Sequence, residues 1–146
     1  MLYFDTSFLA PLFLPESTSG RVTAFIRSLP VGKLAASQWT RVEFSSLIAR
    51  KVRMGELDAE AAARADARFE AMAAESLAVL LPSVEDFALA KRYLGRFETG
   101  LRAGDAFHLA IASNRDAAAI FSLDKRLVTA GKILNLPVRM GIRTKP

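Results

Sequence analysis

The sequence has no cysteine and only one histidine, His108. These absences exclude disulfide bonds, thiolate catalysis and zinc sites built on cysteines or on two histidines, and they suit a reducing cytoplasm. No hydrophobic run approaches the roughly 20 residues of a membrane-spanning helix. The first residues lack the basic lead region of a signal peptide, and Asp5, Pro11 and Pro15 interrupt their apolar stretch. We therefore expect a soluble, cytoplasmic protein with no membrane partner.

The 146 residues are the size of one domain, and 51% of them are hydrophobic, which is enough to form a core. No repeat or linker interrupts the chain, and we expect residues 1–146 to form a single domain. The net charge is +5, and the C-terminal stretch carries Lys132, Arg139, Arg143 and Lys145 without any acid. A basic surface favours polyanions, nucleic acid first, although many small basic proteins bind none.

Short apolar runs alternate with helical patterns along the chain. This alternation is typical of a parallel sheet that is covered by helices on both faces. The ranges expected to form strands are Leu2–Phe4, Leu34–Ala36, Leu77–Leu81, Ala118–Leu123 and Val138–Met140. The ranges expected to form helices are roughly Ser7–Leu14, Ser17–Leu29, Gln38–Met54, Asp58–Glu75, Val84–Phe97, Asp105–Arg115 and Lys125–Leu134.

Two aspartates follow predicted strands. Asp5 stands in LYFDTSFL and Asp124 in IFSLDKRL, each between an apolar run and a predicted helix. Because the carboxyl ends of parallel strands lie along one edge of a sheet, both would point into the same crevice if their strands are neighbours. Aspartate is also a preferred helix N-cap, and for either residue alone capping is the favoured interpretation.

Two further acids lie in helical segments. Asp105, in GLRAGDAFHLAIA, begins an unusually apolar helix, which makes it a cap or places it near the edge of the core. Glu43, in SQWTRVEFSSLIARKV, lies too far inside its helix to be a cap and stands beside an apolar stripe. Its partner is either Arg50, two turns on, or a metal ion, and for Glu43 alone a solvated position or a salt bridge is favoured. Glu85 and Asp86, at a helix start, are expected to be solvated.

Taken together, the four acids suggest a shared site at the carboxyl edge of the sheet. Clustered carboxylates repel each other at low dielectric, so a cation must neutralise them or some must be protonated. Hard divalent cations take oxygen ligands, and Mg²⁺ usually binds a few carboxylates together with waters and a substrate phosphate. A basic exterior would collect a polyanion around such a pocket. The pattern therefore indicates metal-assisted hydrolysis of a phosphodiester.

The stretches LYFDTSFL, RVEFSSLI, GLRAGDAFHLAIA and IFSLDKRL, in this order, resemble the PIN domain family, and more narrowly the VapC-type toxins of bacterial type II toxin–antitoxin modules. The resemblance covers nearly the whole chain. It implies a three-layer α/β/α fold with a parallel, roughly five-stranded sheet. It also implies an endoribonuclease that depends on Mg²⁺ or Mn²⁺ and cleaves structured cellular RNA to 5′-phosphate and 3′-hydroxyl ends. The implied partners are an RNA substrate, a cognate antitoxin that blocks the pocket, and a second copy in a homodimer.

The resemblance carries the acidic quartet of the family onto Asp5, Glu43, Asp105 and Asp124. Of these, Asp5, Asp105 and Asp124 would hold the metal directly or through waters, and Glu43 would help to position the attacking water. The position of the fourth acid, Asp124, varies most in the family. The implied or neighbouring supporting hydroxyls are Thr6, Ser7 and Ser122, of which Thr6 and Ser7 could instead only complete the helix cap.

Other residues near these motifs have two interpretations each. His108 lies one turn from Asp105, but a lone histidine on an apolar helix favours a packed, hydrogen-bonded residue over a ligand. Trp39 and Phe44 are interpreted as core or subunit interface, with base stacking as the alternative. The candidate phosphate contacts, which otherwise form a plain solvated face, are Arg50, Arg53, Arg102 and Lys125.

Two other functions stay open at this point. An aspartate-nucleophile phosphatase also has an aspartate after its first strand, but it normally carries a second one where this chain has Ser7, and the lysine expected before its final acidic pair is missing. A degenerate PIN domain that only binds RNA or a protein would keep the fold without the chemistry. The presence of all four acids argues against this binding module.

Overall fold

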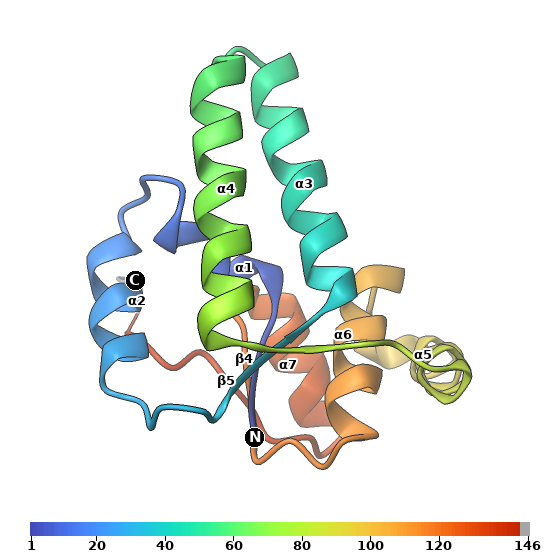
Figure 1. Ribbon diagram of the computed structural model, residues 1–146. Coiled ribbons are helices and arrows are strands. Elements are labelled where there is room, and N and C mark those ends of the chain that lie inside the picture. Colours follow the sequence, from blue (N-terminus) through green and yellow to red (C-terminus); the bar gives the residue numbers. More distant parts are fainter. Residues whose placement is uncertain (144–146) are drawn as a thin grey trace.

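The computed structural model describes residues 1–143, and Figure 1 shows how its helices and strands are arranged. Within this range five strands form one sheet in the order β3-β2-β1-β4-β5, and all neighbours are parallel. This confirms the predicted fold class, and all five predicted strands form with small shifts at their ends. The single domain over residues 1–146 stays a prediction, and Lys145 lies outside the described residues. The strands are β1 (Leu2–Phe4), β2 (Leu34–Ser37), β3 (Ala78–Leu80), β4 (Ala119–Phe121) and β5 (Val138–Arg139).

The described residues form seven α-helices and two 3₁₀ turns. The α-helices are α1 (Thr6–Leu9), α2 (Ser19–Arg27), α3 (Gln38–Arg53), α4 (Ala59–Ser76), α5 (Val84–Leu94), α6 (Ala103–Ser113) and α7 (Lys125–Ile133). The 3₁₀ turns are η1 (Ala10–Leu12) and η2 (Phe97–Thr99). Between residues 1 and 143, no helix combines the length and the apolar character that crossing a membrane requires.

All seven predicted helices form, but several of their ends are shifted. The helix predicted over 7–14 is shorter, because Pro11 has no N–H group and the chain tightens into η1 around it. The helix predicted over 84–97 ends before Gly95, a residue that weakens helices, and the chain continues into η2. Helix α6 starts at Ala103, ahead of the predicted start at Asp105.

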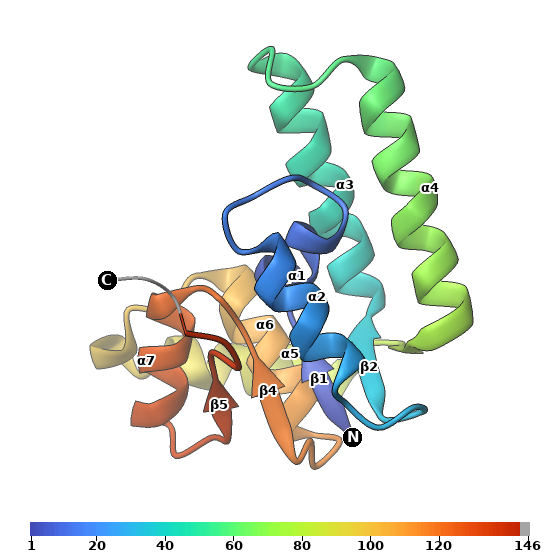
Figure 2. The same ribbon diagram turned by 90° about the vertical axis from the view of Figure 1, so that its left-hand side faces the viewer.

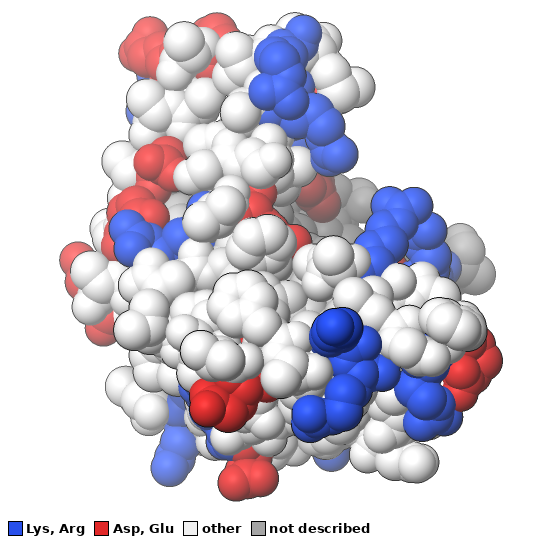
Figure 3. Space-filling view, turned by 90° about the vertical axis from the view of Figure 1, so that its right-hand side faces the viewer, with Lys and Arg blue, Asp and Glu red and all other residues white. Residues whose placement is uncertain are grey.

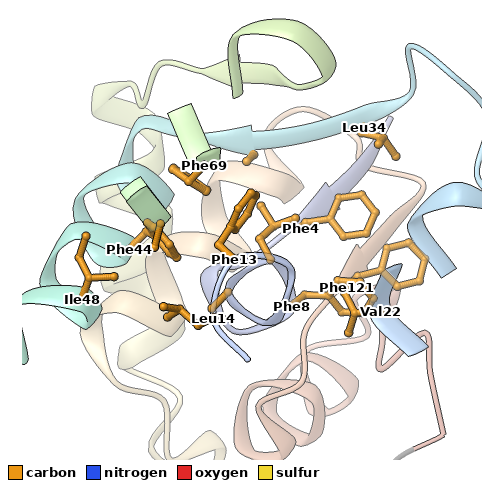
Figure 4. Packing of buried hydrophobic residues seen from close by; sticks show 14 of the residues in the cluster. Phe4, Phe8, Phe13, Leu14, Val22, Leu34, Phe44, Ile48, Phe69 and Phe121 are labelled. Carbon is orange, nitrogen blue, oxygen red and sulfur yellow. The ribbon is translucent and has the colours of Figure 1, made fainter. Parts of the chain in front are cut away.

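The side chains of β1 alternate between the two faces of the sheet. Phe4 joins a buried cluster with α1, α2, α3 and α4, in which Phe8, Phe44 and Phe69 are central (Figure 4). Tyr3 joins the opposite cluster, which contains α5, α6 and α7. Figure 2 shows β2, β1, β4 and β5 side by side between these helices. The two buried clusters confirm the predicted three layers.

Helices α3 and α4 form a long hairpin that projects beyond the sheet (Figure 1). Their first turns are closed by the side chains of Ser37 and Asp58, which accept hydrogen bonds from backbone N–H groups. Phe44 of α3 and Phe69 of α4 stack with their ring centroids 4.5 Å apart. This packing fixes the first half of α3, the part of the helix that carries Glu43.

Asp86 was predicted to be solvated, and this is wrong: its side chain is fully buried. It accepts hydrogen bonds from the N–H of Ser83 (2.8 Å), from Asn114 Nδ2 (2.7 Å) and from Arg115 Nη1 (2.9 Å). Burial works to raise the pKa of Asp86, but these donors and the charge of Arg115 hold it below its usual value. Asp86 therefore joins the start of α5 to the end of α6, a connection that its local sequence does not reveal.

Candidate active site

The carboxyl ends of β1 and β4 lie side by side in the middle of the sheet. The chain proceeds from β1 to β2 on one side and later returns to β4 on the other, and open α/β sheets bind ligands where the strand order reverses in this way. A pocket of about 340 Å³ lies at this edge. Its lining residues are Asp5, Thr6, Ser7, Glu43, Ser46, Leu47, Arg50, Arg53, Asp105 and His108.

Asp5 follows β1 and lies in the pocket wall with only 3% of its surface exposed. Its Oδ1 accepts hydrogen bonds from the N–H of Phe8 (2.9 Å) and from Ser7 Oγ (2.8 Å), so the capping interpretation is confirmed for α1. Burial raises the pKa of the Asp5 carboxyl, and His108 and the hydrogen bonds only partly oppose this shift. The pocket therefore contains a carboxylate whose charge is poorly compensated by the protein.

Ser7 connects the ends of β1 and β4. Its hydroxyl accepts hydrogen bonds from the N–H groups of Leu123 (2.9 Å) and Asp124 (3.2 Å) and lies 3.1 Å from Ser122 Oγ. Ser122 is fully buried and accepts a hydrogen bond from the N–H of Asp124 (3.0 Å). The two serines thus fix the position of Asp124 relative to Asp5.

Glu43 lies in the pocket wall opposite Asp5, and 28% of its side-chain surface is exposed. Its Oε2 accepts a hydrogen bond from Thr6 Oγ1 (2.5 Å) and pairs with His108 Nε2. The partner of Glu43 is therefore His108, and the salt bridge considered with Arg50 is not the one that forms. Burial works to raise the pKa of Glu43, but the hydrogen bond and charge of His108 and the hydroxyl of Thr6 hold it below its usual value.

His108 is buried, with 2% of its surface exposed, and it is hydrogen-bonded at both ring nitrogens. This confirms the interpretation as a packed, hydrogen-bonded residue. Its Nδ1 lies 2.8 Å from the hydroxyl of Tyr3. Burial alone would lower the pKa of His108, but Tyr3, Glu43 and Asp5 outweigh it and raise the pKa to about 10. The pairing with Glu43 therefore favours the protonated form of His108.

Asp105 and Asp124 complete the acidic edge of the sheet. Asp105 is in the first turn of α6 and lies in the pocket wall, while the N-cap of that helix is Arg102, so Asp105 is not a cap. Burial and the charge of Asp124 raise the pKa of Asp105. Asp124 caps α7 with its Oδ1, which accepts hydrogen bonds from the N–H groups of Arg126 (2.8 Å) and Leu127 (3.4 Å).

The charges of Asp5, Glu43 and Asp124 act on Asp105, but the four acids are not arranged as the ligands of a metal ion. Within residues 1–143, no three acidic or histidine side chains are placed so that they could hold a metal ion. Glu43 is turned toward His108 and Thr6, while Asp5 and Asp124 are turned toward helix N–H groups. The assignment of Asp5, Asp105 and Asp124 as metal ligands therefore stays a prediction.

Two of the predicted phosphate contacts face the pocket. Arg50 and Arg53, one turn apart on α3, lie in its wall. Arg102 and Lys125 are exposed at the starts of α6 and α7 and are not among its lining residues. The pocket therefore combines three acidic residues with two arginines of α3.

Sequence reasoning identified His108 as a packed, hydrogen-bonded residue but missed its pairing with Glu43, and it missed the role of Tyr3 altogether. The signal for Tyr3 was a polar hydroxyl inside an otherwise apolar strand. Gly104 was passed over as well: a Cβ there would lie 2.8 Å from Glu43 Oε1 and 3.6 Å from Trp39 Cζ2. Phe44 is core, as predicted, and Trp39 is half-buried against Phe107, which fits its core or interface interpretation.

Several solved structures share this fold. VapC20 of Mycobacterium tuberculosis, described as a sarcin-ricin loop cleaving toxin, superposes with a TM-score of 0.73 at 21% identity, covering 90% of this chain and 95% of VapC20. FitAcB of Neisseria gonorrhoeae superposes with a TM-score of 0.70 at 17% identity, and the match covers 97% of this chain and 98% of FitAcB. VapBC-1 of nontypeable Haemophilus influenzae superposes with a TM-score of 0.70 at 16% identity, and the match covers 98% of this chain and 100% of the other. No curated protein sequence matches the chain significantly.

The fold and the pocket define an open parallel α/β domain with carboxylates at the point where its strand order reverses. More narrowly, the chain belongs to the PIN domain family, whose family model matches residues 2–133. The resemblance of the sequence motifs to the PIN domain family is thereby confirmed, and the solved structures share the fold over most of the chain.

Proposed function

We propose that this protein is a metal-dependent endoribonuclease, the toxin of a toxin–antitoxin module, and that it hydrolyses phosphodiester bonds in structured cellular RNA in the cytoplasm. The observation that carries this proposal is the pocket at the carboxyl edge of the sheet. Three carboxylates, from Asp5, Glu43 and Asp105, line it together with Arg50 and Arg53. Membership of the PIN domain family and the likeness to toxin structures support the same activity.

The donor set of the pocket fits a hard divalent cation. Its acids and hydroxyls offer oxygen atoms, which Mg²⁺ and Mn²⁺ prefer, and cysteine is absent. Burial of Asp5, and burial of Asp105 together with the charge of Asp124, leave negative charge that a cation would stabilise. Asp5, Asp105 and Asp124 would hold the ion, directly or through waters, after rotation of their side chains. A bound ion neutralises charge at the phosphate and activates a water for attack.

The remaining pocket residues have separate roles in this mechanism. Glu43, held by His108 and Thr6, accepts a hydrogen bond from the attacking water and orients it toward phosphorus. Arg50 and Arg53 attract the phosphates on either side of the cleaved bond, because both guanidinium groups line the pocket and phosphate is their natural partner. Ser7 and Ser122 keep the ends of β1 and β4 at a fixed separation.

Two partners belong to the proposal. Among the structural neighbours are toxin–antitoxin pairs such as VapBC-1, which supports a cognate antitoxin that covers the acidic pocket. A homodimer is supported by the outer face around α5, where Figure 3 shows broad uncharged areas with a few charged side chains among them. Large apolar side chains exposed on or beside α5 are Leu81, Val84, Phe87 and Phe97.

The experiment that tests this function is incubation of total RNA with the purified protein in the presence of Mg²⁺ or Mn²⁺, and separately with EDTA. We expect discrete fragments with metal, none with EDTA, and 5′-phosphate and 3′-hydroxyl ends on the products. A small phosphomonoester serves as the control substrate and should not be hydrolysed, because a phosphatase would turn it over. Folded protein that leaves RNA intact with either metal would favour the binding-module alternative.

A further inference from the structure

A chain of hydrogen bonds begins at buried side chains of β1 and β2 and ends at the pocket. The hydroxyl of Tyr3 donates to Ser37 Oγ (3.0 Å) and lies 2.8 Å from His108 Nδ1. The other ring nitrogen of His108, Nε2, pairs with Glu43 Oε2. Ser37, Tyr3 and His108 are at most 2% exposed, whereas Glu43 lies in the pocket wall. The chain therefore runs from the interior of β2 and β1 to one carboxylate at the surface of the pocket.

The apolar surroundings of these polar groups do not account for their presence. His108 lies in α6 among Ala106, Phe107, Leu109 and Ala110, all of which are buried. Ser37 already caps α3 by accepting from a backbone N–H without any help from Tyr3. Buried polar groups cost free energy unless they are paired, and apolar residues of similar shape often serve a core equally well. Glu43 is the point at which this chain of polar side chains reaches the pocket.

Glu43 is anchored at one carboxylate oxygen and has a close neighbour at the other. Oε2 is fixed by Thr6 Oγ1 and by His108. The other oxygen, Oε1, lies beside Gly104. A Cβ on that glycine would be 2.8 Å from Oε1. A free glutamate side chain has many rotamers, and two anchors together with one close wall leave very little freedom. The carboxylate therefore keeps one orientation before any substrate arrives.

We propose that Tyr3 and His108 are positioning residues that hold the Glu43 carboxylate in the orientation needed to align the attacking water. This inference rests on the proposed nuclease function and assigns to the same site two residues that touch neither substrate nor metal. Positioning groups of this kind act on the rate of the chemical step and leave the binding of RNA unchanged, because the phosphate contacts of α3 are not altered.

The decisive variant is Tyr3→Phe, which removes one hydroxyl from the middle of the chain and keeps the ring in the core. We expect kcat for RNA cleavage to fall by about tenfold to a hundredfold, the range typical for supporting hydrogen bonds at a site, with KM unchanged. The melting temperature should fall as well, because the buried Nδ1 of His108 loses its partner, so kcat is measured at a temperature at which the variant is folded. The matched control is Tyr93→Phe. It removes the other tyrosine hydroxyl of the sequence, which donates to Ser113 Oγ (3.1 Å) between α5 and α6 and is not part of the pocket. Its kcat should equal that of the wild type.

A pair of variants at His108 tests the positioning role if the Tyr3→Phe protein does not fold. In His108→Gln, the amide nitrogen can still donate to Glu43, so this variant should retain more activity than His108→Leu, which cannot. Equal loss in the two variants, with both folded, would overturn the positioning role. Full kcat in a folded Tyr3→Phe protein would overturn it as well, while leaving the nuclease function intact.

Nuclear magnetic resonance separates failure of this inference from failure of the proposed function. His108 is the only histidine, so its ring signals are assigned without ambiguity. Both Tyr3→Phe and Glu43→Gln should shift the ring nitrogen signals of His108, and Tyr93→Phe should not. If the wild type cleaves no RNA, the proposed function fails and the positioning role fails with it, even where the ring signals shift. If the wild type is active and the ring nitrogen signals of His108 do not shift in Tyr3→Phe, the chain of hydrogen bonds is refuted.

Discussion

Replacement of Asp5 by asparagine is expected to reduce RNA cleavage by about a thousandfold or more, a loss of about 4 kcal/mol of transition-state stabilisation. Asp5 is the carboxylate at the point where the strand order reverses, and it lies in the wall of the pocket. Asparagine has nearly the same shape but lacks the negative charge that a divalent cation requires. The measurement is the single-turnover rate of cleavage of a defined RNA substrate with Mg²⁺ or Mn²⁺.

The same variant is expected to stay folded. Asparagine is as good an N-cap as aspartate, so the hydrogen bond from the N–H of Phe8 survives. Burial raises the pKa of Asp5, which means that the folded state disfavours the charged form, and a neutral side chain should keep or raise the melting temperature at neutral pH. A rate loss accompanied by unfolding would therefore contradict this account of Asp5.

The matched control for Asp5→Asn is Asp58→Asn. Asp58 caps α4 through the same kind of hydrogen bond, from the N–H of Ala61 (2.7 Å), but it is exposed and is not among the residues lining the pocket. Its cleavage rate should equal that of the wild type. Equal loss in both variants would trace the effect to helix capping and not to the charge in the pocket.

Asp86→Asn is expected to lower the free energy of unfolding by about 3 kcal/mol, the scale found when one partner of a buried ion pair is removed. The variant leaves Arg115 without its carboxylate and replaces an acceptor by a donor next to Asn114. Denaturant unfolding at neutral pH gives the value directly. The control is Glu85→Gln, at the neighbouring exposed position, which should stay within about 0.5 kcal/mol of the wild type. An Asp86→Asn protein as stable as this control would show that the buried pair is not needed.

The pH dependence of stability follows from the same residue. The pKa of Asp86 is lowered in the folded state, so its stabilisation is complete above the unfolded-state value near pH 4 and is lost as pH falls toward the lower folded-state value. The difference in unfolding free energy between wild type and Asp86→Asn should therefore shrink in acid below about pH 4. A difference that stays constant there would contradict the lowered pKa.

Local sequence patterns were sufficient for the sheet. The run Leu2–Phe4 is short and apolar and ends at Asp5, and β1 has those bounds. The patterns also placed Asp5, Glu43 and Asp105 near the carboxyl edge, because strand ends and the next helix start are close in any parallel sheet. Helix ends were less accurate where Pro11 and Gly95 redirect the chain.

Pairings between residues far apart in the sequence could not be predicted from local patterns. Glu43 and His108 are 65 positions apart, and their contact depends on how α3 and α6 pack against the sheet. Asp86 has the local features of a solvated helix start, and only the end of α6 turns it into a buried partner of Arg115. In both cases a charged side chain is buried because a distant element supplies its counter-charge.

The central claim is that the acidic pocket holds a divalent cation, and isothermal titration of Mn²⁺ into the purified protein tests it most directly. The account predicts saturable binding by the wild type, competition by Mg²⁺, unchanged binding by Asp58→Asn, and loss of binding in Asp5→Asn. Folded wild-type protein that binds no Mn²⁺, or an Asp5→Asn variant that binds it as tightly as the wild type, would contradict the claim.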